Sequence, residues 1–203
     1  MTPHRINLFF LVALCLATIA FGGEKSPTVH VVLTTDRGEI ELELDAVRAP
    51  ATTANYLRYV DSGCYNGGVF HRTVTPNNQP ANNVKIEVIQ GGINPARTKE
   101  DGPAITLERT RDTGLRHVDG AISMARAGPD TATSDFFICV SDQPELDFGG
   151  RRNPDGQGFA AFGRVVRGLD VVRAIQRAPA EGQKLTPAVL IIRARRIPNK
   201  ELP

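Results

Sequence analysis

The residues that most often carry enzyme chemistry are few in this chain and stand apart. The four histidines lie at positions 4, 30, 71 and 117, and none belongs to an H-E-x-x-H metal motif. There is no G-x-S-x-G turn for a serine nucleophile and no glycine-rich phosphate loop. Asn153-Pro154-Asp155-Gly156 is similar to the start of a calcium loop but lacks the glutamate that closes it. These patterns argue against a hydrolase or a metalloenzyme, and we expect no metal and no cofactor.

Three other segments stand out by their order and spacing. They are Phe70-His71-Arg72, then Gln90-Gly91-Gly92, then the stretch from Ser123 to Pro129 that continues to Phe136-Phe137-Ile138. Together they resemble the cyclophilins, a family of peptidyl-prolyl cis-trans isomerases. The resemblance continues through Leu146-Asp147 and positions 161–168 and covers roughly residues 28–198. It implies a mainly β fold, a closed eight-stranded antiparallel β-barrel capped by two α-helices, and catalysed rotation of X-Pro bonds.

The resemblance implies a catalytic role for Arg72. Rotation about a peptide bond must cross a barrier of about 18–20 kcal/mol, because amide resonance is lost as the bond twists. The twisted proline nitrogen recovers its lone pair, so a fixed cationic donor aimed at it binds the twisted amide better than either planar form. Arg72 matches the arginine that does this in cyclophilins. Taken alone, an arginine is more often a surface residue, and it is the surrounding motif that favours catalysis.

The resemblance also implies a set of substrate-binding residues. Gln90 matches the glutamine that orients the arginine and contacts substrate, and Phe137 matches the floor of the proline pocket, although core packing alone would also explain a phenylalanine there. Ala125 and Arg126 match the edge strand whose backbone receives the peptide, with Arg126 in place of the more usual asparagine. The remaining implied contacts are Ala127, Val88, Asp135, Leu146 and Phe159.

Several positions depart from the family pattern around the substrate. Glu87 and Val88 stand where phenylalanine and methionine are usual, and Asp135 stands in place of a glutamine. Glu145 replaces a tryptophan or another aromatic residue, so we expect weak cyclosporin binding, whereas Phe159 keeps an aromatic wall. We expect charges at the pocket rim and the smaller Val88 to weaken proline binding, since each lost methylene is worth about 0.8 kcal/mol of burial.

The pattern of apolar residues predicts the elements that position these segments. Alternation and β-branched runs predict strands, and spacings of three and four residues, with Pro50 before and Gly63 after the first, predict two helices. The absence of strand-helix alternation favours a closed antiparallel sheet in one domain. The predicted strands are 29–34, 40–44, 84–88, 121–125, 136–140, 159–166 and 189–195, the helices 51–62 and about 169–175, and the loops 75–83 and 91–120.

Composition narrows the partners. The 203 residues are 41% apolar and 23% charged, with a net charge of +2 from 24 basic and 22 acidic residues mixed along the chain. This is the make-up of one ordinary domain, without the basic patch that nucleic acid or anionic lipid would require. The composition gives no reason to propose an obligate partner, so we expect a monomer. The resemblance implies that it acts on proline-containing polypeptides.

The first 22 residues have the layout of a secretory signal peptide. His4-Arg5 precedes an apolar run over 8–21, and Ala20-Phe21-Gly22 is a small-x-small cleavage pattern. A permanent membrane anchor is the weaker alternative, because a run of about 14 residues is short against the roughly 20 that span a bilayer. Lipidation of Cys15 is disfavoured by Leu14 before it. The sequence therefore predicts export to the periplasm or beyond, with no stable membrane insertion after cleavage.

Removal of this leader leaves two cysteines, Cys64 and Cys139. Whether they pair stays open at this point, because the sequence gives no distance between them. Two functions remain in view: an exported prolyl isomerase, and a peptide-binding or chaperone module on the same barrel. The retained Arg72, Gln90 and Phe137 favour the isomerase.

Overall fold

Two alternating strands begin the part of the chain that the computed structural model describes, residues 28–197. β1 (Thr28–Thr35) and β2 (Gly38–Asp45) form an antiparallel hairpin, as predicted. Ile40, Leu42 and Leu44 are completely buried, because successive side chains on a strand point to opposite faces and one face lines the core. The predicted leader, residues 1–22, lies outside the described residues.

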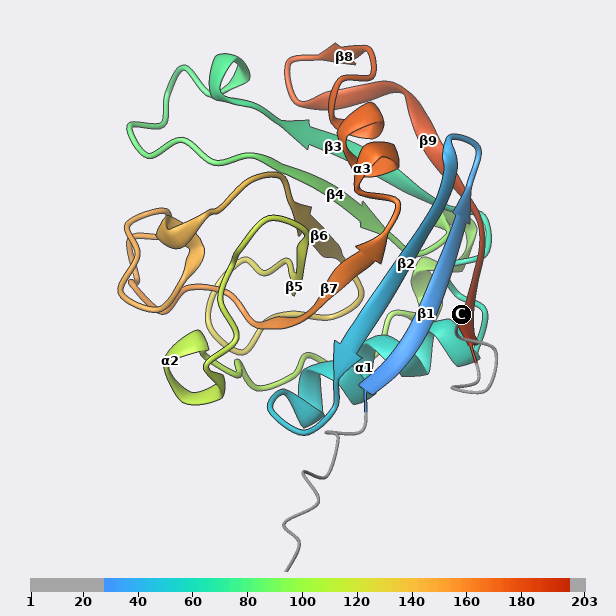
Figure 1. Ribbon diagram of the computed structural model, residues 1–203, viewed down its shortest axis with the longest axis horizontal. Helices are drawn as coiled ribbons and strands as arrows, with labels where there is room; N and C mark the ends of the chain where they lie inside the picture. Colours follow the sequence, from blue (N-terminus) through green and yellow to red (C-terminus); the bar gives the residue numbers. More distant parts are fainter. Residues whose placement is uncertain (1–27, 198–203) are drawn as a thin grey trace, which may run out of the picture.

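The strands close into a barrel, which confirms the eight-stranded antiparallel fold. The order is β1-β2-β7-β5-β6-β4-β3-β9, every neighbouring pair is antiparallel, and β9 pairs back with β1 (Figure 1). A ninth segment, the two-residue β8, only extends the end of β9. The remaining bounds are β3 (Gly68–Val74), β4 (Val88–Gly92), β5 (Ala121–Met124), β6 (Phe136–Cys139), β7 (Ala161–Arg167), β8 (Ala180–Glu181) and β9 (Lys184–Ile197).

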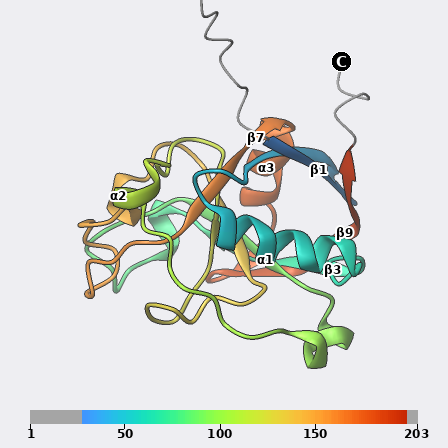
Figure 2. The same ribbon diagram turned by 90° about the horizontal axis from the view of Figure 1, so that it is seen from below.

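The two predicted helices lie at opposite ends of the barrel (Figure 1 and Figure 2). α1 (Pro50–Asp61) begins at a proline, whose fixed φ and missing N–H suit the first helical position. α3 (Leu169–Gln176) buries Val172 and Ile175 completely. The other helical segments are single turns or 3-10 turns: α2 (Thr110–Thr113), η1 (Pro76–Asn78), η2 (Pro95–Glu100) and η3 (Pro144–Leu146).

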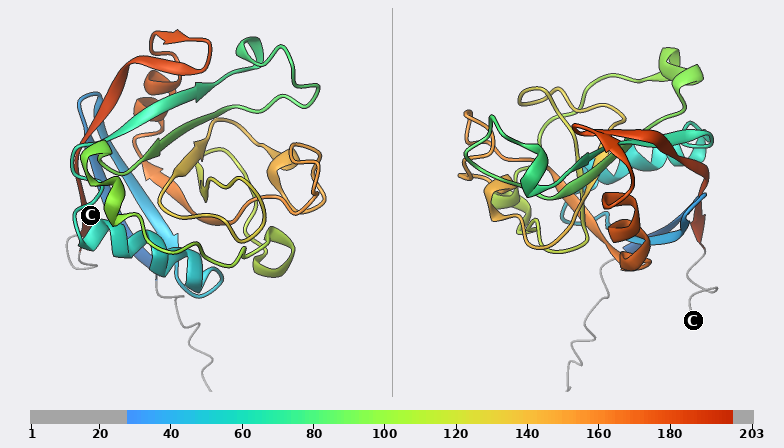
Figure 3. Two further views of the ribbon diagram at one scale, coloured as in Figure 1. Left: turned by 180° about the vertical axis from the view of Figure 1, so that it is seen from behind. Right: turned by 90° about the horizontal axis from the view of Figure 1, so that it is seen from above.

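Among residues 28–197, buried apolar side chains form two separate clusters. The larger fills the barrel and is rich in aromatic rings from α1 and the strands. The smaller includes Val88 and Phe137 from strands and Leu146 from η3, with Phe159 packed against it. The long connections 75–87 and 140–160 lie on the same side of the barrel (Figure 1 and Figure 3). The second cluster therefore gives this side an apolar floor on which a binding site can be built.

Some predicted boundaries were wrong. The strand predicted for 84–88 begins only at Val88, and the one predicted for 159–166 begins at Ala161. Neither β3 nor β8 was predicted, and the predicted loop 91–120 contains the end of β4 as well as η2 and α2. Cys64 and Cys139 are both buried and free. Within residues 28–197, no helix combines the length and the apolar character needed to cross a bilayer.

Candidate active site

Strand register places Arg72, Gln90 and Phe137 in one row across three neighbouring strands. Arg72 on β3 is opposite Gln90 on β4, and Gln90 is opposite Phe137 on β6. Strict alternation would point Phe70 and Arg72 to the same face. The register shifts between them, with His71 as the extra residue of a β-bulge, so Phe70 is completely buried in the core while Arg72 lines the outer pocket.

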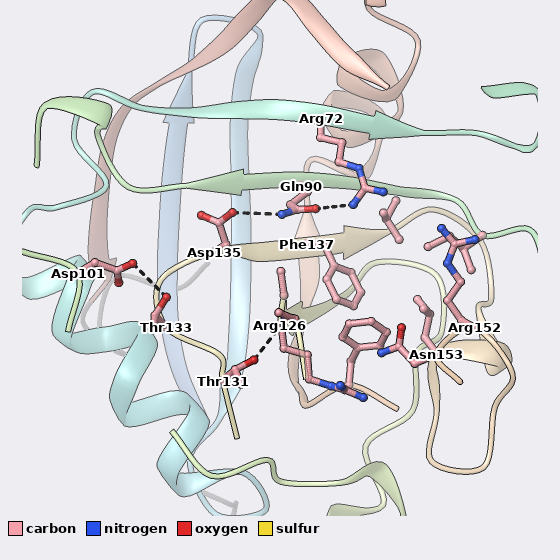
Figure 4. A pocket seen from close by; sticks show the side chains of 16 residues that line it. Arg72, Gln90, Asp101, Arg126, Thr131, Thr133, Asp135, Phe137, Arg152 and Asn153 are labelled. Carbon is pink, nitrogen blue, oxygen red and sulfur yellow. Dashed lines mark hydrogen bonds between the residues drawn. The ribbon is translucent and has the colours of Figure 1, made fainter. Parts of the chain in front are cut away.

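Hydrogen bonds hold the guanidinium of Arg72 from two sides. Nη1 donates to Gln90 Oε1 at 2.8 Å, and Nε and Nη2 donate to Gln183 Oε1 at 2.9 and 2.7 Å. Gln90 Nε2 in turn donates to Asp135 Oδ2 at 3.1 Å (Figure 4). Arginine only donates and an ionised carboxylate only accepts, so these partners fix which end of the Gln90 amide faces each.

Partial burial lowers the pKa of Arg72. The ordinary value is so far above neutrality that the side chain stays charged. A charge in a partly dry site acts more strongly on a neighbouring dipole than it would in water.

The floor of the pocket is apolar and aromatic. Phe137 and Phe159 meet edge to face, with ring centroids 5.3 Å apart and planes at 88°. Val88 and Leu146 are buried beside them, and so is Ile86, a pocket residue that the sequence did not predict. The smaller cluster thus forms a hydrophobic surface next to a fixed cation.

A buried polar chain lies behind Phe137. The His117 ring stacks on Phe137 with centroids 5.9 Å apart, and its Nδ1 and Nε2 lie 2.8 Å from Asp147 Oδ1 and 3.0 Å from Ser123 Oγ. The carboxylate only accepts, so neutral His117 donates from Nδ1 and accepts from the serine hydroxyl at Nε2. Burial lowers the pKa of His117, an effect that Asp147 opposes.

Ser123, His117 and Asp147 are the residue types of a nucleophile, a base and an orienting acid. However, His117 is 1% exposed, Ser123 0% and Asp147 4%. Ser123 is therefore closed to substrate. The three hydrogen-bonded side chains support the aromatic floor and do not form a second reactive centre.

Arg126 forms a wall of the pocket rather than a free charge. Its side chain is 1% exposed, its Nη1 donates to Asp155 Oδ2 at 2.8 Å, and its Nε donates to the Gly158 carbonyl at 2.8 Å. The guanidinium carbon lies 5.0 Å from the centre of the Phe159 ring. Arg126 thus fixes the loop that carries this ring.

The pocket measures about 570 Å³ and is lined by all ten residues predicted for the site. Figure 4 shows Arg72 and Gln90 on one side, Phe137 at the centre, and the carboxylates of Asp101 and Asp135 toward one end. Six lining residues were missed in the sequence, and all come from loops or from a segment without a recognised motif: Ile86, Asp101, Thr131, Thr133, Arg152 and Asn153.

Two charges expected at the pocket rim lie elsewhere. Glu87 turns toward α3, where its Oε2 accepts from Gln176 Nε2 at 3.1 Å. Glu145 pairs with Arg151, 2.6 Å from Oε1 to Nη2, outside the pocket. The apolar surface expected to be lost at position 87 is instead supplied by Ile86. Of the three expected rim charges, only Asp135 lines the pocket.

The described residues contain no cluster suited to a metal ion. In the range 28–197, no three of His, Cys, Asp or Glu come together as ligands for a metal ion. What the pocket presents is a fixed guanidinium beside an aromatic floor.

Comparison with known proteins identifies the family. The model of the cyclophilin type peptidyl-prolyl cis-trans isomerases matches residues 30–196. Peptidyl-prolyl cis-trans isomerase A of Dickeya dadantii is 36% identical over 178 residues, which cover 87% of this chain and 86% of the relative. A peptidyl-prolyl cis-trans isomerase of Acinetobacter baylyi is 35% identical over 169 residues, covering 83% and 82%.

Solved structures show the same fold. A Cryptosporidium parvum cyclophilin type peptidyl-prolyl cis-trans isomerase superimposes with a TM-score of 0.68 at 24% identity, covering 85% of this chain and 99% of that one. The same enzyme crystallised in the presence of the dipeptide Ala-Pro gives a TM-score of 0.67, with 84% and 99% covered. The chain therefore belongs to the cyclophilin type peptidyl-prolyl cis-trans isomerases.

Proposed function

We propose that the pocket isomerises X-Pro bonds by seating the proline ring on Phe137 and presenting the guanidinium of Arg72 to the proline nitrogen. The observation that carries this proposal is the row Arg72, Gln90, Phe137, in which a held cation stands next to an apolar floor. β3 and β6, the outer strands of this row, lie roughly 10 Å apart, at about 4.8 Å for each neighbouring pair. Arg72 and Phe137 both line the pocket between these strands.

The remaining predicted residues have supporting roles in this proposal. Gln90 holds Arg72, Val88 and Leu146 extend the floor, and Phe159 forms a wall that Arg126 fixes. The backbone at Ala125 to Ala127 binds the extended peptide by main-chain hydrogen bonds. Asp135 holds the amide of Gln90. Because the reaction is a rotation, in which no bond is broken, this mechanism needs no cofactor.

The experiment is the rate of cis-to-trans conversion of short X-Pro peptides with the purified protein, Arg72→Ala and Arg72→Lys. A hydrogen bond to a charged group is worth about 1.5–3 kcal/mol, so we expect Arg72→Ala to lose roughly 10- to 150-fold in rate. Lysine keeps the charge without the planar fork and should fall between the two.

Peptide binding, measured separately by titration, distinguishes an isomerase from a binding module. Binding without acceleration by the unsubstituted protein, across several residues X, would favour a module that keeps the barrel and lacks the chemistry. Acceleration that survives in Arg72→Ala would refute the role of Arg72.

The proposed place of action is outside the cytoplasm, in the periplasm or after secretion. The layout of residues 1–22, with charged residues, an apolar run and a small-x-small pattern, supports export. We propose that residues 28–198 are the functional domain, and that it is a monomer acting on proline-containing polypeptides. N-terminal sequencing of protein from cell fractions tests the proposal. A chain that begins near residue 23 in an extracytoplasmic fraction is expected, and an uncleaved chain in the cytoplasm would contradict it.

A further inference from the structure

Gln183 contacts Arg72 from a part of the chain far from the family motifs. It lies in the turn between β8 and β9, 111 residues from Arg72 in the sequence. Its side-chain oxygen accepts from both Nε and Nη2 of Arg72, at 2.9 and 2.7 Å. Gln183 does not line the pocket. It therefore reaches the reacting bond only through the arginine.

The side chain of Gln183 is itself held in one orientation. Its Nε2 donates to the main-chain carbonyl of Asn78 at 3.1 Å, and the main-chain carbonyl of Gln183 accepts from Thr73 N at 2.9 Å. Asn78 Nδ2 donates to the neighbouring Gly182 carbonyl at 3.0 Å. With its amide nitrogen committed to a carbonyl, Gln183 can present only its oxygen to Arg72.

Two amide oxygens thus bind opposite parts of one guanidinium. A guanidinium has five N–H groups, and the bonds to Gln90 and Gln183 use three of them. One N–H remains on each terminal nitrogen for a substrate. Both acceptors are uncharged, so they restrict the position of Arg72 without neutralising its charge.

We infer that Gln183 is a positioning residue for the isomerase reaction and that the turn between β8 and β9 is a functional part of the site. The inference rests on the proposed role of Arg72. An arginine side chain has large rotamer entropy, and Gln90 alone leaves the Nε edge free to turn. The bond pair from Gln183 restrains this edge, so that the remaining N–H groups stay directed at the proline nitrogen.

Two substitutions separate geometry from charge. Gln183→Leu removes the acceptor with little change in size, and Gln183→Glu keeps an acceptor but places a negative charge against Arg72. The control is Glu181→Ala, an exposed position on the same hairpin. The measurements are kcat and KM for an X-Pro peptide, peptide binding by titration, thermal unfolding, and the NMR signal of the Arg72 Nε–H group.

For Gln183→Leu we expect kcat to fall about tenfold with KM and peptide affinity within twofold of the unsubstituted protein, and the Arg72 Nε–H signal to shift and broaden. For Gln183→Glu we expect a similar loss of kcat, because a negative charge then lies against Arg72. The bond to the Asn78 carbonyl is lost in this variant, but the charged pair with Arg72 should keep the Nε–H signal sharp. Glu181→Ala should match the unsubstituted protein in every measurement.

An unchanged kcat in Gln183→Leu would overturn the inference, and so would a loss of kcat that only follows a loss of folding or of peptide affinity. Failure of the proposed function would look different. In that case the unsubstituted protein itself would not accelerate the reaction, while the Nε–H signal would still report whether Gln183 holds Arg72.

Discussion

Folding stability at mildly acidic pH should depend on His117, the ring behind the pocket floor. Burial lowers its pKa from the ordinary 6.5. At a pH between the folded and the unfolded pKa, the unfolded chain binds a proton that the folded protein does not. The contribution of neutral His117 to the free energy of unfolding is therefore complete above pH 6.5. It is lost as the pH falls below 6.5, by about 1.4 kcal/mol for each pH unit through which the folded ring stays neutral.

The carboxylates act in a different pH range. Desolvation by burial raises the pKa of Asp147, but its hydrogen bonds, chiefly with His117, outweigh this and leave it below its ordinary 3.8. Its contribution is present above that value and is lost only as the pH falls through the lower folded pKa. The interval from pH 6.5 to pH 5 thus separates the effect of His117 from that of Asp147.

The assay is urea unfolding between pH 8 and pH 5 of the unsubstituted protein, His117→Gln and, as a control, His71→Gln. His71 is a partly exposed histidine on the same side of the barrel as the pocket. We expect His117→Gln to be less stable at pH 8 but to lose up to about 2 kcal/mol less between pH 6.5 and pH 5. His71→Gln should follow the unsubstituted protein. Parallel curves for His117→Gln and the unsubstituted protein would refute the reasoning.

Three further substitutions test the floor, the core and the wall. Val88→Met adds about one methylene of apolar surface at the pocket and should tighten binding of an X-Pro peptide about fourfold, from roughly 0.8 kcal/mol, as measured by calorimetric titration; weaker binding would show that the pocket has no space there. Tyr56→Phe removes a buried hydroxyl that has no hydrogen-bond partner among the described residues and should raise the free energy of unfolding by about 1 kcal/mol, whereas destabilisation would reveal a missing partner. Arg126→Ala breaks charged hydrogen bonds and should lower the free energy of unfolding by about 2 kcal/mol. It should also raise KM because Phe159 is no longer held in place, and an unchanged KM would contradict the role of Arg126 in the pocket wall.

Local periodicity was enough to predict most elements but failed where side chains pack outside the barrel. The β1–β2 hairpin, α1 and α3 follow regular spacing and were predicted. β3 was not, because the bulge at His71 breaks the alternation between Phe70 and Arg72. Ile86 mimics a strand residue because it is buried in the outer cluster, although β4 begins two residues later.

The site was predictable where it depends on motifs and unpredictable where it depends on loops. The family resemblance named ten residues that share one pocket. Ile86, Arg152 and Gln183 carry no local pattern, because their positions follow from how distant segments meet. Glu87 and Glu145 were expected at the rim, but each has a partner that draws it away, a choice that only three-dimensional packing decides.

The pairing of β1 with β9 also affects how the protein folds during synthesis. His30 lies opposite Ile197, so the sheet stays open, with two bare strand edges, until the last strand is available. Contacts between residues so distant in sequence must overcome a large loop-closure entropy and form slowly, on the scale of milliseconds to seconds. Gln183 reaches Arg72 only when this final hairpin docks. A nascent or truncated chain would therefore expose aggregation-prone strand edges and lack the contact that orders Arg72. If Arg72 acts as proposed, isomerase activity should appear only at the end of folding.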